Sequence, residues 1–424
     1  MVDNIQVSRL ASGLTILTDS MPGVRSATLG FFFRVGSRHE PIGLNGISHF
    51  IEHAVFKGTN RRSALDIAIE QDRLGGNLDA FTTHEETGFA IKVIDDQLPK
   101  AFDLIADMLA EPRFDDADLK AEQRVIIEEM KMIEDSPEEY LGEIFSEAFF
   151  LDHPLGLNIA GTPKTVKTFS SQVTRQYHRD VYTASNLVIA AAGNVTHKEL
   201  VALAESAFGN KRSEGQITKD KDPKPACASP ILIKQNKNLE QAHLIIATPL
   251  VSATDDRRYA ADLLTNIIGG GTSSRLWQKV REERGLAYNV GASLATYQDC
   301  GVFSIFAGTS PEQVEEVVEL SISELRDVVR NGVTPDELVV AKQTSRASIL
   351  LSLEDSASRA AALAQSEMVH GRQISVEETL AEIDAVTPED IHAIAQEYFR
   401  SENVAFAALG DLKYLNIERS TLTI

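Results

Sequence analysis

The chain has 424 residues, of which 43% are hydrophobic and 24% are charged, a composition typical of globular proteins and a length sufficient for two or three domains. Its net charge of −21 disfavours nucleic acids and anionic membrane surfaces as partners. Two cysteines are too few for a disulfide framework or a cysteine-based zinc site. The apolar runs are far shorter than the roughly 18 residues of a membrane span, and the first residues lack the pattern of a signal peptide. We therefore expect a cytoplasmic protein without a membrane partner.

The predicted elements alternate between strands and long helices. The chain opens with two strand-like segments, Gly13–Thr18 and Thr28–Val35. Helix starts with a capping residue followed by proline and acidic residues stand at Ser136-Pro137-Glu138-Glu139 and at Thr334-Pro335-Asp336-Glu337. This mixture predicts an α+β fold in which a mostly antiparallel sheet packs with long helices.

Two sequence patterns occur twice. Asn186–Val195 (NLVIAAAGNV) returns as Asn403–Leu412 (NVAFAALGDL), and Thr83–Gly88 (THEETG) returns as Thr296–Gly301 (TYQDCG). Both pairs are separated by roughly 210 residues, which indicates an internal duplication. The segment Lys211–Pro230 between the halves is polar and rich in proline, as linkers are. The sequence therefore predicts two homologous domains, 1–210 and 231–424, joined by a linker at 211–230.

The first half carries a metal-binding pattern, H-x-x-E-H, from His49 to His53. On a helix these positions share a face, so both imidazoles can reach one Zn²⁺. Glu52 is placed to polarise a water at the metal rather than to bind the metal. The alternative is a solvated helix with two unrelated histidines, but the apolar residues around the motif indicate a buried helix, where isolated polar groups are costly. The pattern predicts one Zn²⁺ per chain, bound by His49 and His53.

A catalytic zinc site usually has three protein ligands, so a third is expected from elsewhere. Residues 115–135 are predicted to form a long helix, on which Glu122 and Glu129 share a face and Glu128 points about a quarter-turn away. Periodicity alone leaves Glu128 and Glu129 open as the third ligand, although a solvated surface position is the simpler interpretation of Glu128.

These residues resemble the pitrilysin family of zinc metallopeptidases, in the branch of mitochondrial processing peptidase subunits and bacterial processing proteases. The family pairs H-x-x-E-H with a downstream glutamate in a V-I-x-x-E context, and Val125–Glu129 matches it. The resemblance selects Glu129 as the third ligand and implies that Glu122 supports the zinc site from behind. Glu85, in the segment Gly75–Thr87, falls at another acidic position of the family and is expected to play a similar supporting role.

The resemblance also implies where a substrate binds. Gly75–Thr87 resembles the family's edge-strand segment, and a peptide that adds there as a further strand is held through its backbone. Many relatives carry Asn where this chain has Asp79, and a carboxylate lacks the amide's donor groups. The residues expected to contact substrate are Leu78, Asp79, Ala80, Phe81 and Thr82.

The second half lacks H-x-x-E-H and is expected to contact substrate without a zinc of its own. Gly269–Val290 resembles the family's second-domain signature, in which an arginine and a tyrosine contact the peptide near the scissile bond. Arg281 and Tyr288 stand at that spacing, and each can donate a hydrogen bond to a carbonyl oxygen that gains negative charge. From the residues alone, a surface ion pair for Arg281 and core packing for Tyr288 are the simpler interpretations.

The motif and the resemblance together predict a zinc-dependent endopeptidase that cleaves extended or unfolded peptides, with Glu52 as the base. Family members enclose substrate in a chamber of four such domains, so a homodimer, or a heterodimer with a related subunit, is expected. The acidic balance favours basic, targeting-type peptides. Two rivals are a non-proteolytic core or assembly subunit of a larger complex, which predicts no bound zinc, and a zinc enzyme that is not a peptidase.

Overall fold

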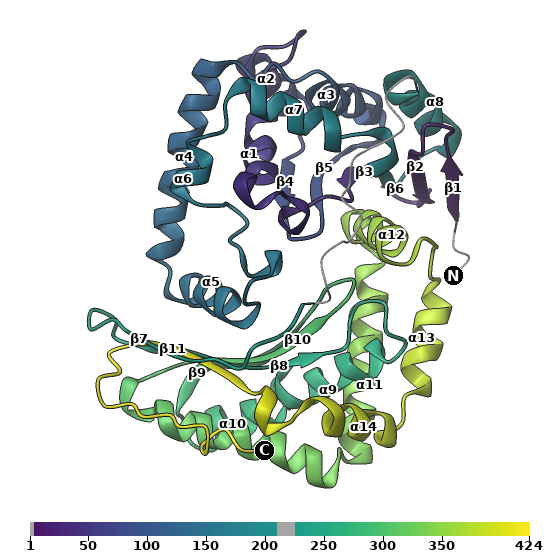
Figure 1. The fold of residues 1–424 in the computed structure, drawn as a ribbon. Helices are drawn as coiled ribbons and strands as arrows, with labels where there is room; N and C mark the ends of the chain where they lie inside the picture. The colour runs from purple at the N-terminus through teal and green to yellow at the C-terminus, as the bar shows by residue number, and fades with distance from the viewer. Residues whose placement is uncertain (1–3, 210–224) are drawn as a thin grey trace. The chain divides into compact units, whose positions relative to one another are not determined.

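The computed structural model describes residues 4–209 and 225–424, which form two compact units (Figure 1). The first unit comprises 4–131, 157–209 and 350–375, and the second comprises 132–156, 225–349 and 376–424. The units therefore differ from the contiguous sequence halves, because each contains a segment from the other half. Most of the predicted linker at 211–230 lies outside the described residues.

The first unit is built on a six-stranded sheet in the order β1-β2-β6-β3-β5-β4. Neighbouring strands pair antiparallel, except that β2 and β6 are parallel. β4 lies at one edge and pairs with β5, so the sheet leaves the other side of its backbone unused. The strands are β1 (Ile5–Arg9), β2 (Thr15–Ser20), β3 (Ser26–Phe33), β4 (Leu78–Thr82), β5 (Thr87–Ile94) and β6 (Leu187–Gly193).

The main core of this unit lies between one face of the sheet and helices of the first half of the chain. Phe31 on β3 is fully buried and contacts Phe102 and Phe208, with ring centroids 5.2 and 6.1 Å away. These two rings belong to α3 (Leu98–Ala110) and α8 (His197–Phe208). The other helices from the first half of the chain that begin in this unit are α1 (Ile47–Ala54), α2 (Ala64–Leu74), α4 (Asp116–Glu134), α6 (Pro163–Val166) and α7 (Ser171–Val181).

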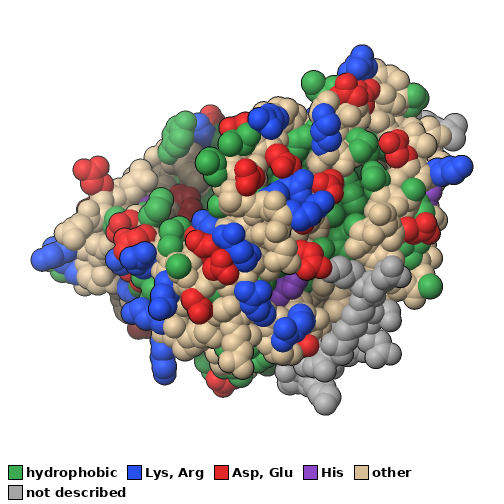
Figure 2. Space-filling view, turned by 90° about the horizontal axis from the view of Figure 1, so that it is seen from above, with side chains coloured by type: hydrophobic (Ala, Val, Ile, Leu, Met, Phe, Trp, Pro, Cys, Tyr) green, Lys and Arg blue, Asp and Glu red, His purple; other side chains and the backbone are tan. Residues whose placement is uncertain are grey.

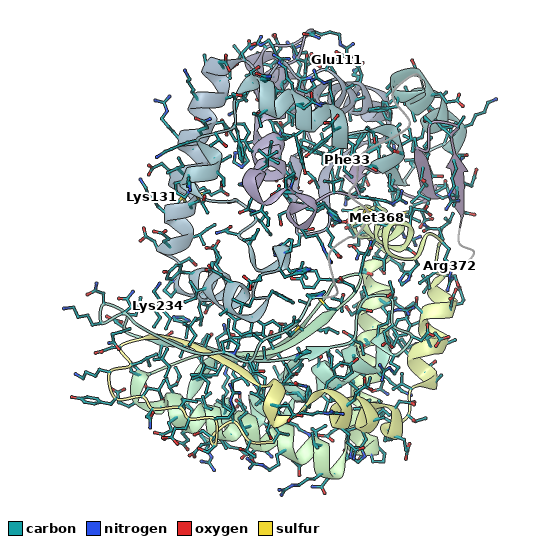
Figure 3. The ribbon with its side chains drawn as sticks, viewed as in Figure 1. Phe33, Glu111, Lys131, Lys234, Met368 and Arg372 are labelled. Carbon is teal, nitrogen blue, oxygen red and sulfur yellow. The ribbon has the colours of Figure 1, made fainter. Side chains whose placement is uncertain are left out.

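The opposite face of the same sheet is covered by α12 (Ser356–His370), which comes from the second half of the chain. Leu363 and Ala364 pack against Val188 and Ala190 of β6, whose neighbours along the strand face the main core, as strand alternation requires. Met368, labelled on α12 in Figure 3, packs against the same cluster.

Polar contacts also tie α12 to this sheet. Glu367, which is 3% exposed, accepts hydrogen bonds from Arg9 at 2.8 Å. Arg359 donates to Asp19 at 2.5 Å. Because these carboxylates are buried, removing one partner leaves an uncompensated charge, and the contacts fix the position of the helix.

The second unit contains a five-stranded sheet in the order β7-β11-β8-β10-β9. Its strands pair antiparallel except for β7 and β11. The strands are β7 (Ile231–Gln235), β8 (Ala242–Leu250), β9 (Ala287–Thr296), β10 (Gly301–Thr309) and β11 (Ala405–Gly410). The helices are α9 (Arg258–Gly269), α10 (Val314–Asn331), α11 (Pro335–Ser352), α13 (Val376–Ala385) and α14 (Pro388–Tyr398).

This unit also receives a helix from the other half of the chain. Phe145 and Phe149 of α5 (Pro137–Phe149) pack against Ala405 and Ala407 of β11, while the intervening Phe406 faces the main core of the unit. Each sheet is therefore covered on one face by a helix from the other half of the sequence.

The two sheets share one topology, as the internal repeat predicts. β6 lies between β2 and β3, and β11 lies between β7 and β8 in the same way. The α+β fold with mostly antiparallel sheets is confirmed. Among the described residues, none of the helices combines the length and apolar character that crossing a membrane requires. On the face drawn in Figure 2, acidic and basic side chains are interspersed.

Candidate metal centre and active site

The H-x-x-E-H residues lie on α1, a helix of eight residues. It begins after Gly46, whose φ of 96° lies in the left-handed region that glycine tolerates best. The carboxylate of Glu40 accepts hydrogen bonds from the backbone N–H groups of Gly46 and Ser48, both at 2.7 Å, so it satisfies two donors that a helix start leaves without partners. The apolar residues of α1 are buried in the main core of the unit. This packing holds the helix in place and fixes the direction of its metal-binding face.

Three side chains from two helices converge on one point. The Nε2 atoms of His49 and His53 lie 3.8 and 3.6 Å from Oε2 of Glu129 on α4, and the potential ligand atoms of the three residues all lie within 4.8 Å of one another. Among the described residues, this is the group of histidine, cysteine and acidic side chains that can hold a metal ion. The structure thus brings Glu129 to the two histidines, whereas Glu128 pairs with Lys131 at 2.7 Å.

The donor set fits Zn²⁺ in number and chemistry, because two imidazoles and one carboxylate leave a fourth position open for a catalytic site. Oε2 of Glu129 is buried and has no hydrogen-bond partner within the described ranges. A buried carboxylate oxygen without a partner is costly, and a cation bound between it and the two imidazoles would remove that cost. His49, His53 and Glu129 are therefore the residues that would hold the ion.

Behind the histidines, Glu122 fixes the ring of His53. Oε1 of Glu122 accepts a hydrogen bond from Nδ1 of His53 at 2.9 Å, and its Oε2 pairs with Nζ of Lys57 at 2.6 Å. Glu122 is 3% exposed. With its Nδ1 proton donated to Glu122, His53 presents Nε2 towards Glu129, which is the arrangement that outer partners of metal ligands commonly impose. Lys57 is a part of this arrangement that the sequence motif does not indicate.

Glu52 stands beside the three potential ligands but outside their group. Its Oε2 accepts a hydrogen bond from the Thr82 hydroxyl at 2.7 Å, and this contact ties α1 to the edge strand β4. The sequence predicts that Thr82 contacts substrate, and its spacing gives no sign of the hydrogen bond to Glu52. The other predicted edge residues lie on β4 as expected, with Leu78 buried, Asp79 exposed, and Ala80 and Phe81 half-buried.

Burial and local charge shift the proton affinities of the cluster. Burial, helped by the neighbouring His53, lowers the pKa of His49 to about 4, so its imidazole is neutral at pH 7, as a metal ligand must be. Burial also lowers the pKa of His53, but the hydrogen bond to Glu122 and the charges of Glu129 and Glu52 outweigh it and raise the pKa. Burial raises the pKa of Glu52. The negative charge that raises the pKa of His53 would also attract a metal cation.

Glu85 lies in the turn between β4 and β5 and forms an ion pair with the buried Arg38 at 2.6 Å.

Arg281 and Tyr288 belong to the second unit, where the Arg281 guanidinium lies 4.6 Å from the centre of the Tyr288 ring. Tyr288 is 79% exposed, so core packing does not explain it. The structure brings these two residues together.

Residues 15–163 match the family model described as Insulinase (Peptidase family M16), and residues 168–345 match the one described as Peptidase M16 inactive domain. A Streptomyces coelicolor protein named an uncharacterized zinc protease is 37% identical over 423 residues, covering 97% of this chain and 91% of that protein. This chain belongs to peptidase family M16. The zinc protease YmxG of Bacillus subtilis, also named uncharacterized, is 36% identical over 398 residues and covers 94% of this chain and 96% of its own.

Solved structures show the same fold for both M16 domains. A protease from Helicobacter pylori superposes with a TM-score of 0.87 at 21% identity, covering 96% of this chain and 100% of that chain. A structure titled peptidase M16 inactive domain, from Pseudomonas fluorescens, gives a TM-score of 0.89 at 21% identity, with 96% and 98% covered. The resemblance to pitrilysin-type zinc peptidases is thus confirmed. The H-x-x-E-H motif lies in the Insulinase match, and residues 168–345 contain none.

Proposed function

We propose that this chain is a zinc-dependent endopeptidase that cleaves extended or unfolded peptides. The observation that carries the proposal is the convergence of Nε2 of His49 and His53 on Oε2 of Glu129, a buried oxygen without a hydrogen-bond partner among the described residues. Glu52 lies on the same helix as the two histidines. The relatives' names, which call them zinc proteases, agree with it.

Each residue of the centre would then have a distinct role. When bound, zinc polarises the scissile carbonyl and lowers the pKa of water. Glu52 takes the proton of the attacking water and passes it to the leaving amine. Its raised pKa favours proton uptake, and Thr82 holds its carboxylate in one orientation. Glu122 keeps His53 in the tautomer that offers Nε2.

The substrate would add to β4 as a further strand. Backbone hydrogen bonds along an edge strand accept any extended peptide, while side-chain pockets set the preference. Following the family resemblance, we assign Arg281 and Tyr288 to the stabilisation of the oxyanion. The net charge of −21 favours basic, targeting-type peptides.

We further propose that two chains enclose the substrate, as a homodimer or as a heterodimer with a related subunit. The proposal rests on the family resemblance. Sedimentation of the purified chain with and without a bound peptide tests it, and a monomer that cleaves peptides at full rate would exclude it.

Cleavage of a quenched fluorescent basic peptide tests the activity, with metal content measured on the same samples. Wild type and Glu128→Gln should both cleave, because Glu128 is an exposed glutamate on the same helix as Glu129. Glu52→Gln should retain zinc and lose at least about 100-fold in rate, and a chelator should abolish cleavage. Wild type that binds no zinc and cleaves nothing would support the assembly-subunit hypothesis instead.

A matched pair of peptides that differ only in Lys and Glu content tests the preference for basic substrates. The basic peptide should have the higher kcat/KM, and the difference should shrink with added salt because exposed charges are screened. Faster cleavage of the acidic peptide would refute the preference and leave the activity standing.

A further inference from the structure

The guanidinium of Arg281 lies over two aromatic rings. Its Cζ is 3.9 Å from the centre of the Trp277 ring and 4.6 Å from the centre of the Tyr288 ring. The ion pair between its Nε and Oε1 of Glu282 is 3.9 Å long, beyond hydrogen-bond distance. Within the part of the chain that the structure describes, ring stacking therefore holds this guanidinium, and its donor groups stay available.

Two neighbouring cations of the same segment are held by carboxylates and not by aromatic rings. Arg275 donates to Glu337 at 2.6 and 2.9 Å and to Asp327 at 2.8 Å. Lys279 forms an ion pair with Glu324, which is 2% exposed. These contacts attach one side of the segment to α10 and α11. Trp277 and Arg281, which stack on each other, are not the residues that form these ion pairs.

The backbone of the stack is unusual. Trp277–Glu282 is a π-helical turn, in which the N–H of Glu283 donates to the carbonyl of Gln278 at 2.9 Å. Such turns are rare and occur frequently at functional sites. The indole N–H of Trp277 donates to Glu282 at 3.1 Å, which fixes the plane of the ring against which Arg281 lies.

We propose that Trp277 is a positioning residue for Arg281. Together with Tyr288 it fixes the plane of the guanidinium, so that the donors along its edge are oriented for the carbonyl oxygens of a bound peptide before the peptide arrives. The identity of the ligand rests on the proposed peptidase function. The stack itself is a property of the free chain and can be tested without turnover.

Trp277 is the only tryptophan of the sequence, so its emission reports on the stack directly. Arg281→Ala should change the emission spectrum of the free protein. The matched control Arg284→Ala should not, because Arg284 pairs with Glu316 at 2.7 Å and lies outside the stack. In a Glu52→Gln background, which prevents cleavage, a basic peptide should change the emission saturably, and Arg281→Ala should abolish that change.

Kinetics separate positioning from a merely structural role. Trp277→Leu should lower kcat/KM by about tenfold, whereas Trp277→Phe keeps a ring and should stay within about threefold of wild type. In an Arg281→Ala background, Trp277→Leu should have no further effect, because it acts through the guanidinium. Zinc content should be unchanged throughout.

Two results would overturn the inference. One is a Trp277→Leu effect that persists in full without Arg281, and the other is a Trp277→Leu enzyme with wild-type kcat/KM. If wild type with bound zinc cleaves none of the peptides, the proposed function fails. The change of Trp277 emission on adding peptide then decides by itself whether the stack binds a peptide. An emission that no peptide changes would refute the role of Trp277 as well.

Discussion

Replacing Glu122 by glutamine tests how the zinc ligands are held. Glu122 touches neither the point where the metal would lie nor the reacting atoms, yet its two oxygens contact His53 at 2.9 Å and Lys57 at 2.6 Å. The substitution keeps the size of the side chain and an acceptor for the His53 N–H, and it removes the negative charge.

The expected loss follows from these contacts. A hydrogen bond to a charged acceptor is roughly twice as strong as a neutral one, so the His53 contact should weaken by about 1 kcal/mol, or about fivefold in zinc affinity. Lys57 keeps its charge opposite a neutral amide, but its side chain is 34% exposed, so water compensates for much of that loss. Outer partners of metal ligands typically contribute 10–100-fold. We expect about tenfold weaker zinc binding for Glu122→Gln and about 100-fold for Glu122→Ala.

Competition between the apoprotein and a chromophoric chelator measures this affinity. Glu128→Gln is the control, because Glu128 lies on the same helix with its side chain 69% exposed and pairs with Lys131 at the surface. It should bind zinc as tightly as wild type. Lys57→Met should change zinc affinity less in a Glu122→Gln background than in the wild-type background, because the two residues act through one contact.

Two results would contradict this role of Glu122: zinc binding by Glu122→Gln within about twofold of wild type, or an equal weakening by Glu128→Gln. The first result would mean that packing of α1 alone orients His53. The second would mean that the net charge of α4 matters and the individual contact does not.

Two further predictions concern α1 and its neighbours. Thr82→Val removes a donor to Glu52 and should raise the pKa of that carboxyl further, which moves the acid limb of the kcat/KM profile to higher pH. Thr82→Ser should leave the limb in place, and equal limbs for the two variants would contradict the role of the hydroxyl. Gly46→Ala forces a side chain into φ 96° with its Cβ 2.4 Å from the Ala160 carbonyl oxygen and should lower the free energy of unfolding by about 2–4 kcal/mol. Gly43→Ala, with nothing within 4 Å of its Cβ, should stay within about 0.5 kcal/mol in denaturant titrations.

Local periodicity was enough to find the part of the centre that one helix carries. His49, Glu52 and His53 share a face because of their spacing alone. Periodicity left Glu128 and Glu129 open, and the family resemblance selected Glu129. The structure brings Glu129 to the histidines and turns Glu128 to solvent, since residues adjacent in a helix point in different directions.

The partners that orient these residues could not be read from spacing, because they come from other elements. Glu40 caps α1 from the loop before it, and burial raises its pKa to about 7; an acidic residue shortly before a short helix is a weak signal for this. Thr82 reaches Glu52 from a strand. The Trp277 ring contacts the Arg281 guanidinium within one π-helical turn. The sequence pattern of this segment does not distinguish a π turn from an α-helical one.

Because α12 comes from the second half of the chain and covers the sheet of the first unit, we expect that neither half of the sequence folds stably alone. Cutting the chain within 211–230 separates the two sequence repeats, and the first half then lacks α12. Leu17, Phe32, Val188 and Ala190, all at most 5% exposed in the structure, would lose their cover, and an uncovered apolar face of this kind favours association. The separately expressed halves should therefore bind an apolar dye and melt without cooperativity, whereas co-expressed halves should co-elute and melt cooperatively. A first half that stays monomeric and melts cooperatively alone would show that α12 is dispensable to the sheet it covers.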